Sequence, residues 1–381
     1  MAKKVSLLIL GGTGIIGREL TTLALKKGFA VFVVSRGNKK ATVDGVTLIH
    51  ADVRNNDSFA MAVKDYTFDA AIDLVSFNAF QATSVMNILQ NKTKQYMFVS
   101  SATIFEGVGG REKITEKSSL ITSGWAYPLE KIQAEEAVKV AALKFGLSYT
   151  IVRPYITYSD QRISFGQWEG FSVANDILKN VPLVIGTGLE DALTTLTHSS
   201  DLAFAMVGLI GNKRALNEDF NITSDESMTW KQVFEVTGTI LGVKPRFVRV
   251  SSAEIIKNFP HLRGKIEDRC AGRVFDNSKI KRAIPGFKAS YSILEGYSEI
   301  LTSKKTFSVS KVSYFNRGKL DRIIYKNSNT NDKRVVLATK ESLSVRDLIK
   351  YQLGFSLLFS RLVSFSKSLL TSSHDYKLKS F

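Results

Sequence analysis

The amino-acid sequence predicts an α/β fold built on a parallel, doubly wound sheet, followed by a basic helical tail. Short apolar runs alternate with helical patterns through residue 154, the order typical of parallel strands joined by crossover helices. Glycines stand between the first two of these runs, where a strand turns into a helix. Of 381 residues, 44% are hydrophobic and only 6 are prolines, which indicates a folded protein.

The first strand–helix–strand unit spans residues 5–36. Residues 5–10 are apolar except for Ser6, as expected of a strand buried on both faces. A helical pattern then runs to Gly28, and residues 29–34 supply the next parallel strand. The glycines of GGTGIIG therefore lie where such units bind a dinucleotide pyrophosphate.

Three glycines of this turn have distinct predicted roles. Gly11 permits the tight turn, Gly14 lets backbone amides approach a pyrophosphate, and Gly17 lets the helix pack close to the strand. This context favours a Rossmann-type dinucleotide site over a merely structural glycine turn. We assign to that site Gly11, Thr13, Gly14, Ile15, Ile16, Gly17 and Arg18.

The residues that end the second strand indicate the cofactor. An NAD site usually has Asp or Glu there to accept hydrogen bonds from the ribose, whereas this chain has Ser35, Arg36 and Gly37. Arg36 can form a forked contact with a 2′-phosphate, and Arg18 can assist. The alternative is that Arg36 is an ordinary solvated side chain. The sequence favours NADP, with NAD as the second choice.

Further strands and helices complete the predicted sheet. The sequence predicts strands at residues 46–49, 68–74, 95–99 and 148–152, and helices at residues 57–63, 83–89 and 125–145. In such sheets, ligands bind at the carboxyl ends of the strands. The candidate site residues lie at those ends.

A reactive pair lies on the last of these helices. Tyr127 and Lys131 are four residues apart and therefore share one helical face. A nearby ammonium lowers the pKa of a tyrosine, which suits the phenol to exchange a proton with a carbinol. Ser101, after the strand at 95–99, is placed to hold the alcohol oxygen. This Tyr–Lys spacing is common by chance. Its occurrence after a glycine turn and a strand that ends in Ser-Ser favours a catalytic pair.

With these motifs, the chain resembles the extended short-chain dehydrogenase/reductase family, the NAD(P)-dependent nucleotide-sugar epimerases and dehydratases. The resemblance covers residues 5 to about 301. It includes GGTGIIG, FVSSATIF, the Tyr127–Lys131 pair, VRPYITY, HSSDLA and VFDNSKIKR.

The resemblance implies roles for individual residues. Ser101 holds a sugar hydroxyl or keto oxygen, Tyr127 exchanges its proton, and Lys131 binds the nicotinamide ribose. The further cofactor contacts that it implies are Asp52 and Val53 beside the adenine and Pro154 beside the nicotinamide.

One departure from the family limits the chemistry. At this strand end the 4,6-dehydratases of the family have a motif similar to S-T-D-E-V-Y, and its Asp-Glu pair removes water from the sugar. This chain has Ser-Ala-Thr-Ile-Phe at 101–105, with Thr103 as a substrate contact and neither carboxylate. The resemblance therefore implies epimerisation or keto reduction rather than elimination.

By the same resemblance, residues 1–165 form the cofactor domain and residues 166–301 a smaller α+β substrate lobe. The elements predicted in that lobe are a helix at 202–210, a strand at 220–223 and a helix from the cap Thr229 to Gly242. The family binds the nucleotide diphosphate in this lobe. Arg263, Arg269 and Arg273 are the candidates for a phosphate contact, and we assign Arg269 and Arg273 to the substrate.

Residues 302–381 form a basic tail outside the resemblance. They hold 16 Lys and Arg against 5 Asp and Glu, in a chain whose net charge is +17. The sequence predicts an amphipathic helix at 345–370 that begins with the capping box Ser344-x-x-Asp347. Its apolar face and basic residues are typical of a peripheral membrane helix, and its uncharged runs are too short to span a bilayer. The alternative is a helix docked on its own enzyme or across a homodimer.

Three functions remain open at this point. The leading one is a cytoplasmic, NADP-linked oxidoreductase or epimerase that acts on a nucleotide-sugar in surface polysaccharide biosynthesis, with its tail at the inner membrane face. The second is an RNA-binding protein, because GGTGIIG and SRG also resemble plastid stem-loop-binding relatives and basic segments suit phosphate backbones. The third is a membrane-recruited redox sensor with little turnover. The single cysteine, Cys270, suits a reducing compartment, and no metal ligands are assigned.

Overall fold

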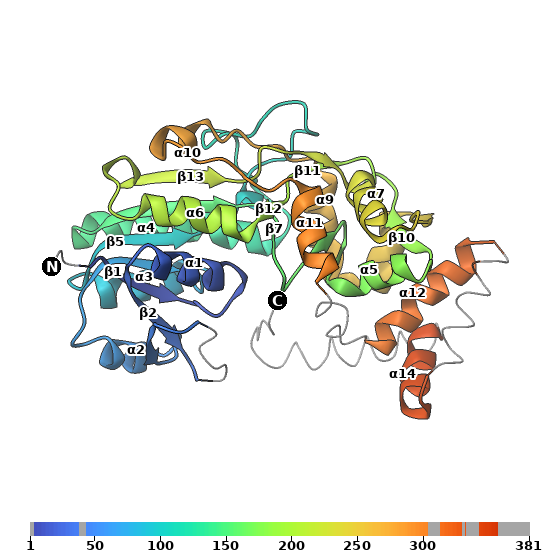
Figure 1. The fold of residues 1–381 in the computed structure, drawn as a ribbon, viewed down its shortest axis with the longest axis horizontal. Helices are drawn as coiled ribbons and strands as arrows, with labels where there is room; N and C mark the ends of the chain where they lie inside the picture. The colour runs from blue at the N-terminus through green and yellow to red at the C-terminus, as the bar shows by residue number, and fades with distance from the viewer. Residues whose placement is uncertain (1–3, 38–42, 304–312, 330–331, 333–342, 357–381) are drawn as a thin grey trace.

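The structure, a computed structural model, describes residues 4–37, 43–303, 313–329, 332 and 343–356. Its largest element is a seven-stranded sheet in the order β13-β6-β5-β4-β1-β2-β3 (Figure 1). Every neighbouring pair in this sheet is parallel, so the carboxyl ends of all seven strands lie at one edge. The doubly wound parallel sheet predicted from the sequence is confirmed.

The strands and helices of this part follow the predicted alternation. The strands are β1 (Ser6–Leu10), β2 (Ala30–Ser35), β3 (Thr47–His50), β4 (Phe68–Asp73), β5 (Thr93–Val99), β6 (Ser148–Pro154) and β13 (Glu218–Ile222). The helices are α1 (Ile15–Lys26), α2 (Asn56–Ala62), α3 (Ala79–Leu89), α4 (Ala126–Phe145), α6 (Ser199–Leu209) and α10 (Ser278–Ala283). Each helix and strand predicted up to residue 154 begins and ends within four residues of its expected bounds.

The pleat of the strands divides the core into two layers. Leu7 and Ile9 pack with side chains of α1, α6 and α10 on one face of the sheet. Leu8 and Leu10 pack with side chains of α2, α3 and α4 on the other face. Alternate side chains of a strand point to opposite faces, and all four leucine and isoleucine side chains are fully buried. This is why β1 is an almost continuous apolar run.

The strand predicted at 220–223 belongs to the large sheet rather than to the smaller lobe. It is β13, and it pairs in parallel with β6 along its whole length, with Phe220 opposite Val152. Phe220 and Ile222 are buried in the same core as α1 and α6. The chain therefore returns to the cofactor-binding part after residue 198, and the division at residue 165 does not separate two contiguous units.

The smaller lobe holds short paired strands covered by helices. Its strands are β7 (Thr157–Tyr158), β8 (Ser164–Phe165), β9 (Trp168–Glu169), β10 (Leu183–Gly186), β11 (Leu193–Thr194), β12 (Thr197–His198), β14 (Met228–Thr229) and β15 (Phe247–Val250). Its helices are α5 (Phe171–Leu178), α7 (Trp230–Leu241), α8 (Ser252–Asn258), α9 (Arg263–Cys270) and α11 (Ile293–Thr302). The predicted cap at Thr229 and the helix end at Gly242 are confirmed, with a full capping box and a left-handed Gly242.

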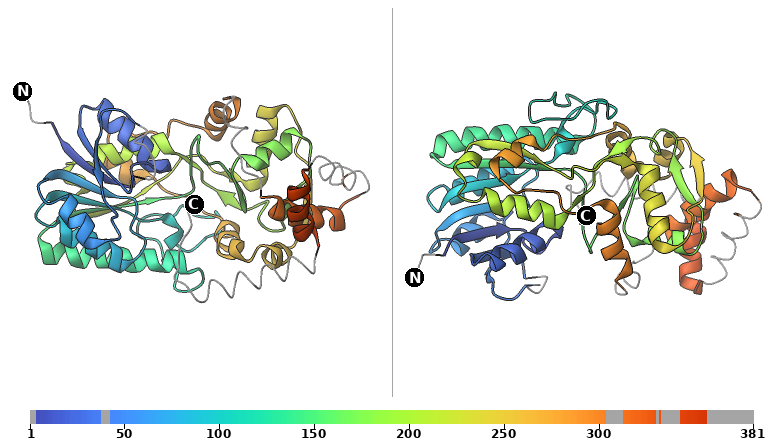
Figure 2. Two further views of the ribbon diagram at one scale, coloured as in Figure 1. Left: turned by 90° about the horizontal axis from the view of Figure 1, so that it is seen from below. Right: turned by 45° about the horizontal axis from the view of Figure 1, so that its top comes forward.

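The described part of the tail forms two helices, α12 (Tyr314–Asn327) and α14 (Val345–Phe355). Both lie at the end of the molecule away from the large sheet (Figures 1 and 2). Ile323 and Ile324 of α12 are buried in one core with Val248 and Ile255 of the smaller lobe. The sequence analysis did not predict α12.

Helix α14 begins where the sequence predicts it. The Ser344 hydroxyl accepts the N–H of Asp347 at 3.3 Å and donates to the Asp347 carboxylate at 2.7 Å. Its Tyr351 is buried against α12, which is the docked alternative for this part of the helix. The remainder of the predicted helix, residues 357–370, lies outside the described residues. Among the residues that are described, no helix has the length and apolar character needed to cross a membrane.

Candidate active site

The glycine turn joins β1 to α1 as predicted. Gly11 has a φ of 90°, in the left-handed region that favours glycine. A Cβ on Gly17 would collide with the carbonyl oxygen of Gly11 and lie 2.7 Å from the Cα of Gly12, so the helix and the turn touch through backbone atoms. A Cβ on Gly14 would meet only the Gly11 oxygen, at 3.4 Å, which leaves the outer side of the turn open.

Helix α1 presents its first backbone amides at this open side. Its N-cap, Gly14, makes no side-chain hydrogen bond, and its first turn contains no acidic residue. Such amides have no partner within the helix and attract anions. The turn and the helix start therefore fit the pyrophosphate of a dinucleotide.

The end of β2 carries a cation and no carboxylate. Arg36 and Gly37 follow Ser35 at exposed positions, and Arg36 has no ion pair within the described part of the chain. Arg18 forms a surface ion pair with Asp160, with 3.4 Å between Nη1 and Oδ2. The structure thus leaves Arg36 available to an anion and gives Arg18 a protein partner.

Asp52 and Val53 lie beside the end of β2. The N–H of Ala51 donates to the carbonyl of Ser35 at 3.2 Å, which draws the two strand ends together. Oδ1 of Asp52 accepts the N–H of Arg54 at 3.0 Å, and Val53 packs against the core. The adenine contact that the family resemblance implies for these two residues stays a prediction.

Ser101 stands just beyond β5, at the start of a single 3₁₀ turn. Its Oγ accepts the N–H of Thr103 at 3.3 Å and the Thr103 hydroxyl at 3.0 Å. Because a hydroxyl has one proton, these contacts leave the Ser101 proton to donate elsewhere. Ala102 and Ile104 are fully buried and Glu106 is exposed, so this turn presents no carboxylate.

Three side chains of α4 share one face that points to the sheet. Tyr127, Lys131 and Glu135 follow one another at intervals of four residues. Glu135 binds Arg153 of β6 through two hydrogen bonds, of 2.9 Å to Nε and 2.6 Å to Nη2. This buried pair fixes α4 against β6, and with it the position of the two reactive side chains.

The Lys131 ammonium is buried between two strand ends. Its Nζ donates to the carbonyl of Ser76, after β4, at 2.8 Å, and to the carbonyl of Val99, in β5, at 2.9 Å. It also lies 4.8 Å from the centre of the Phe98 ring. Burial lowers the pKa of Lys131 to about 8, although the charge of Asp73 opposes this shift.

Tyr127 is half-buried, with its hydroxyl near Ser101. Burial raises the pKa of Tyr127 above its ordinary value, and its interactions with Ser101 and Arg162 oppose this shift only in part. The sequence analysis expected Lys131 to lower this pKa, and in this structure that expectation is wrong. The Lys131 ammonium is held by carbonyl oxygens instead of by the phenol.

Pro154 is the last residue of β6, two residues beyond the predicted strand end. The sequence analysis missed Arg162 in the segment that follows. Its Nη2 donates to the carbonyl of Thr157 at 2.9 Å, while its Nε is buried without a hydrogen-bond partner among the described residues. Its charge acts on both Tyr127 and Glu169. An arginine in an irregular segment has no periodic pattern that would have identified it.

Arg269 and Arg273 are not poised to bind a diphosphate. Each is only 4% exposed. Arg269 is paired with Glu169, and Arg273 with Asp268, both at 2.6 Å. A phosphate contact would have to replace a buried ion pair. Arg263 is exposed, with 66% of its side chain accessible. The structure therefore does not support the two substrate assignments made from the sequence.

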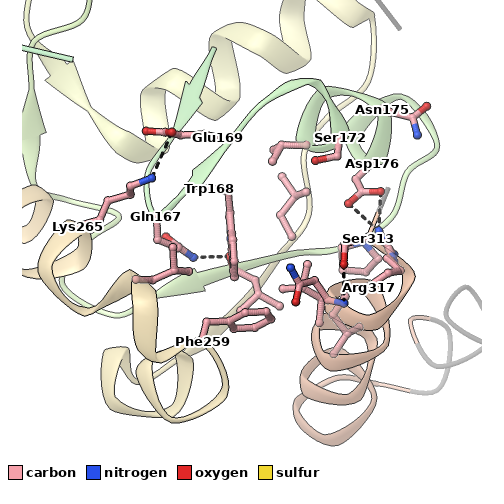
Figure 3. Close-up of a pocket in the computed structure, with 18 of the residues that line it drawn as sticks. Gln167, Trp168, Glu169, Ser172, Asn175, Asp176, Phe259, Lys265, Ser313 and Arg317 are labelled. Atoms are coloured by element: carbon pink, nitrogen blue, oxygen red, sulfur yellow. Dashed lines mark hydrogen bonds and ion pairs between the residues drawn. The ribbon is translucent and has the colours of Figure 1, made fainter. Parts of the chain in front are cut away.

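A pocket of about 310 Å³ lies between the smaller lobe and α12 (Figure 3). Its walls combine apolar and charged side chains, among them Trp168, Phe259, Lys265, Asp176 and Arg317. None of Ser101, Tyr127 and Lys131 lines it. The pocket is thus separate from the candidate active site at the strand ends.

Comparison with known proteins finds a matching family model and related sequences. The model of the NAD dependent epimerase/dehydratase family matches residues 7–223. A chloroplast stem-loop binding protein of 41 kDa from Arabidopsis thaliana is 21% identical over 77% of each chain. The 2′-dehydrokanamycin reductase of Streptomyces kanamyceticus is 23% identical over 74% of this chain and 79% of its own.

A solved structure shares the fold. The UDP-glucose 4-epimerase of Thermus thermophilus, solved in complex with NAD, superposes with a TM-score of 0.64 at 16% identity. The match covers 80% of this chain and all of the epimerase chain.

Proposed function

The chain belongs to the NAD dependent epimerase/dehydratase family, and from this premise we propose that it is an NAD(P)-dependent oxidoreductase or epimerase acting at a carbinol or keto group of a nucleotide-sugar. The observation that carries the proposal is the meeting of Ser101, Tyr127 and Lys131 at the strand edge that also holds the glycine turn. Reductase and epimerase relatives, one of them a UDP-glucose epimerase, support the choice of a sugar.

In the proposed mechanism, the residues of this chain hold the substrate and move its proton. The bound nicotinamide supplies the chemistry of accepting or returning a hydride. The Ser101 hydroxyl donates to the substrate oxygen, and Tyr127 takes or returns the proton on that oxygen. Lys131, already oriented by two carbonyl groups, binds the ribose hydroxyls as a cation. Burial of Tyr127 raises its pKa, so at neutral pH it starts as the proton donor, as keto reduction requires.

We propose NADP as the preferred cofactor, with Arg36 as the residue that selects it. Arg36→Ala should weaken NADPH binding by about 1–3 kcal/mol, the usual loss for a charged hydrogen bond, and should leave NADH binding nearly unchanged. Calorimetric titration of both cofactors measures the difference. Tighter binding of NADH than of NADPH by the unmodified protein would refute the assignment.

Elimination of water is not part of the proposal. The 3₁₀ turn after Ser101 consists of Ala102, Thr103 and Ile104, all buried, and none of them carries the carboxylate that elimination needs. Of the family chemistries, keto reduction and epimerisation remain.

The decisive experiment is a substrate search. The purified chain is incubated with NADPH or NADH and a panel of nucleotide-sugars, and products are identified by mass spectrometry and NMR. Reduced or epimerised sugar that is absent from a Tyr127→Phe sample supports the proposal. An unchanged panel with both cofactors would refute it.

The similarity to a stem-loop binding protein favours RNA binding as the second candidate function. Binding to phosphate backbones weakens steeply with salt. Titration of a labelled RNA stem-loop at low and moderate salt, with NADPH as competitor, separates the two functions. Salt-sensitive RNA binding without sugar turnover would favour this alternative.

The burial of one predicted lipid-facing residue weakens the proposal that residues 345–370 contact a membrane. Tyr351, on the apolar face predicted to meet lipid, is 1% exposed. Its hydroxyl donates to Asp321 of α12 at 2.9 Å. The predicted apolar face therefore loses Tyr351 to a protein contact, although Ile349 of the same helix is 57% exposed. Co-sedimentation with anionic vesicles at low salt, before and after truncation at residue 356, measures the contribution of the chain beyond residue 356.

A further inference from the structure

Asp73, the last residue of β4, is a fully buried carboxylate that the proposed mechanism does not use. Its Oδ1 accepts the N–H groups of Val75 and Ser76, each at 2.9 Å. Its Oδ2 accepts the hydroxyls of Ser76 and Tyr96, each at 2.6 Å. All four partners donate, as an ionised carboxylate requires. Within the described residues, Asp73 has no ion pair with a lysine or arginine.

The turn that Asp73 holds, residues 74–77, touches both halves of the candidate site. Val75 packs against the glycine turn, where a Cβ added to Gly11 would lie 2.7 Å from its Cγ1. The carbonyl of Ser76 accepts Nζ of Lys131 at 2.8 Å. The ring of Phe77 has its centre 5.2 Å from the same nitrogen. A shift of this turn would therefore move the lysine's anchor and the wall of the glycine turn together.

We propose that Asp73 is a positioning residue for Lys131. Its hydrogen bonds to the 74–77 turn place the carbonyl group that holds the ammonium, and its negative charge keeps that ammonium protonated in a buried site. The inference rests on the proposed function, in which Lys131 acts as a cation on the cofactor ribose.

The other charges around Lys131 are less able to serve this purpose. Glu130 and Glu135 act on it electrostatically from its own helix. Glu135 is already bound to Arg153 through two hydrogen bonds. Among these groups Asp73 contributes most to raising the pKa of Lys131, against the lowering by burial. Its removal should therefore shift the lysine further toward the neutral form.

The test follows the titration of Lys131 by NMR on full-length chain labelled with ¹³C at lysine Cε, with Lys131→Arg to assign the signal. Asp73→Asn removes the charge in the same shape, and Tyr96→Phe removes one hydrogen bond but keeps the charge. The Lys131 midpoint should fall by about one pH unit in Asp73→Asn, the effect of losing one nearby opposite charge. It should stay within about 0.3 pH unit in Tyr96→Phe. Equal midpoints in Asp73→Asn and the unmodified chain would overturn the proposal.

The pH profile of turnover supplies a second reading. The alkaline limb of kcat should move to lower pH in Asp73→Asn and stay in place in Tyr96→Phe, which a merely structural role of Asp73 would not produce. If Asp73→Asn does not fold, the double variant Ser76→Ala/Tyr96→Phe decides. It should keep the Lys131 midpoint but lower kcat, and an unchanged kcat overturns the proposal. The NMR titration needs no substrate, so a failed substrate search refutes the proposed function and leaves this test intact.

Discussion

At the scale of single residues, the site depends on groups whose ionisation is shifted by burial. Tyr127 and Lys131 lie one helical turn apart, yet each has its own polar partners. Tyr127 meets Ser101, and Lys131 is bound by two carbonyl groups. The pair therefore works through position and charge, and each member can be tested separately.

The proton-transfer role of Tyr127 predicts a large effect of one oxygen atom. Tyr127→Phe should lower kcat by about 10²–10⁴-fold, the usual contribution of a general acid or base. Cofactor affinity should change little, because the ring stays in place. Steady-state kinetics on the identified substrate and calorimetry with NADPH measure the two quantities.

Tyr66→Phe is the matched control for this change. Tyr66 stacks on Phe68 with ring centres 6.1 Å apart, in the core that also holds α2 and α3. Removal of its hydroxyl should leave kcat unchanged. Wild-type turnover in Tyr127→Phe would remove Tyr127 from the mechanism.

Burial of the Lys131 ammonium predicts a stability cost with a defined pH window. The pKa of Lys131 falls from 10.5 to about 8 on folding. This shift corresponds to about 3 kcal/mol. Lys131→Met should therefore unfold at higher denaturant concentration than the unmodified chain at pH 7, while turnover is lost.

The sign of the pH dependence follows from proton binding. Between pH 8 and 10.5 the unfolded chain binds more protons at Lys131 than the folded chain, so rising pH stabilises the unmodified protein relative to Lys131→Met. The free energy of unfolding of Lys131→Met should therefore exceed that of the unmodified protein by less and less as the pH rises across this window. Urea unfolding of both proteins at several pH values measures it, and a constant difference would contradict the buried-ammonium account.

At the scale of elements, two glycines at the junction of β1 and α1 have different predicted roles, Gly17 in packing and Gly14 in cofactor binding. Gly17→Ala places a Cβ against the backbone of Gly11 and Gly12 and should destabilise the fold by roughly 1–3 kcal/mol. Gly14→Ala meets only one oxygen, at 3.4 Å, and should fold normally. It should still weaken the dinucleotide by about tenfold or more, because the added methyl stands where the pyrophosphate approaches. Urea unfolding and cofactor titration of both variants distinguish the roles, and normal NADPH affinity in folded Gly14→Ala would place the cofactor elsewhere.

At the scale of the whole molecule, buried ion pairs attach the tail to the smaller lobe. Arg317 of α12 binds Asp176 of α5 at 2.6 Å and Asp321 of its own helix at 2.8 Å. Asp321 in turn accepts the Tyr351 hydroxyl of α14. Burial raises the pKa of both Asp176 and Asp321, and the charge of Arg317 opposes that shift.

Removal of this arginine should therefore leave two buried carboxyl groups without their cation. Arg317→Met should destabilise the protein by about 3–5 kcal/mol, the usual result of breaking one side of a buried ion pair. Lys350→Met is the control, since Lys350 and Asp347 form a surface pair 3.8 Å apart. It should change stability by less than about 0.5 kcal/mol. Urea unfolding compares them, and equal stabilities would show that the tail is only loosely attached.

The sequence by itself determined the features that depend on neighbours along the chain. The alternation of strands and helices, the glycine turn and the spacing of Tyr127 and Lys131 follow from local periodicity and backbone freedom, and the structure has them where they were predicted. Tertiary structure alone decided what depends on distant partners. Phe220 joins the large sheet through β6, and Arg269 turns to Glu169 instead of a phosphate. Ser76 lies 55 residues from Lys131, and Asp176 lies 141 residues from Arg317. No pattern along the chain encodes such contacts, because they form only when folding buries both groups together.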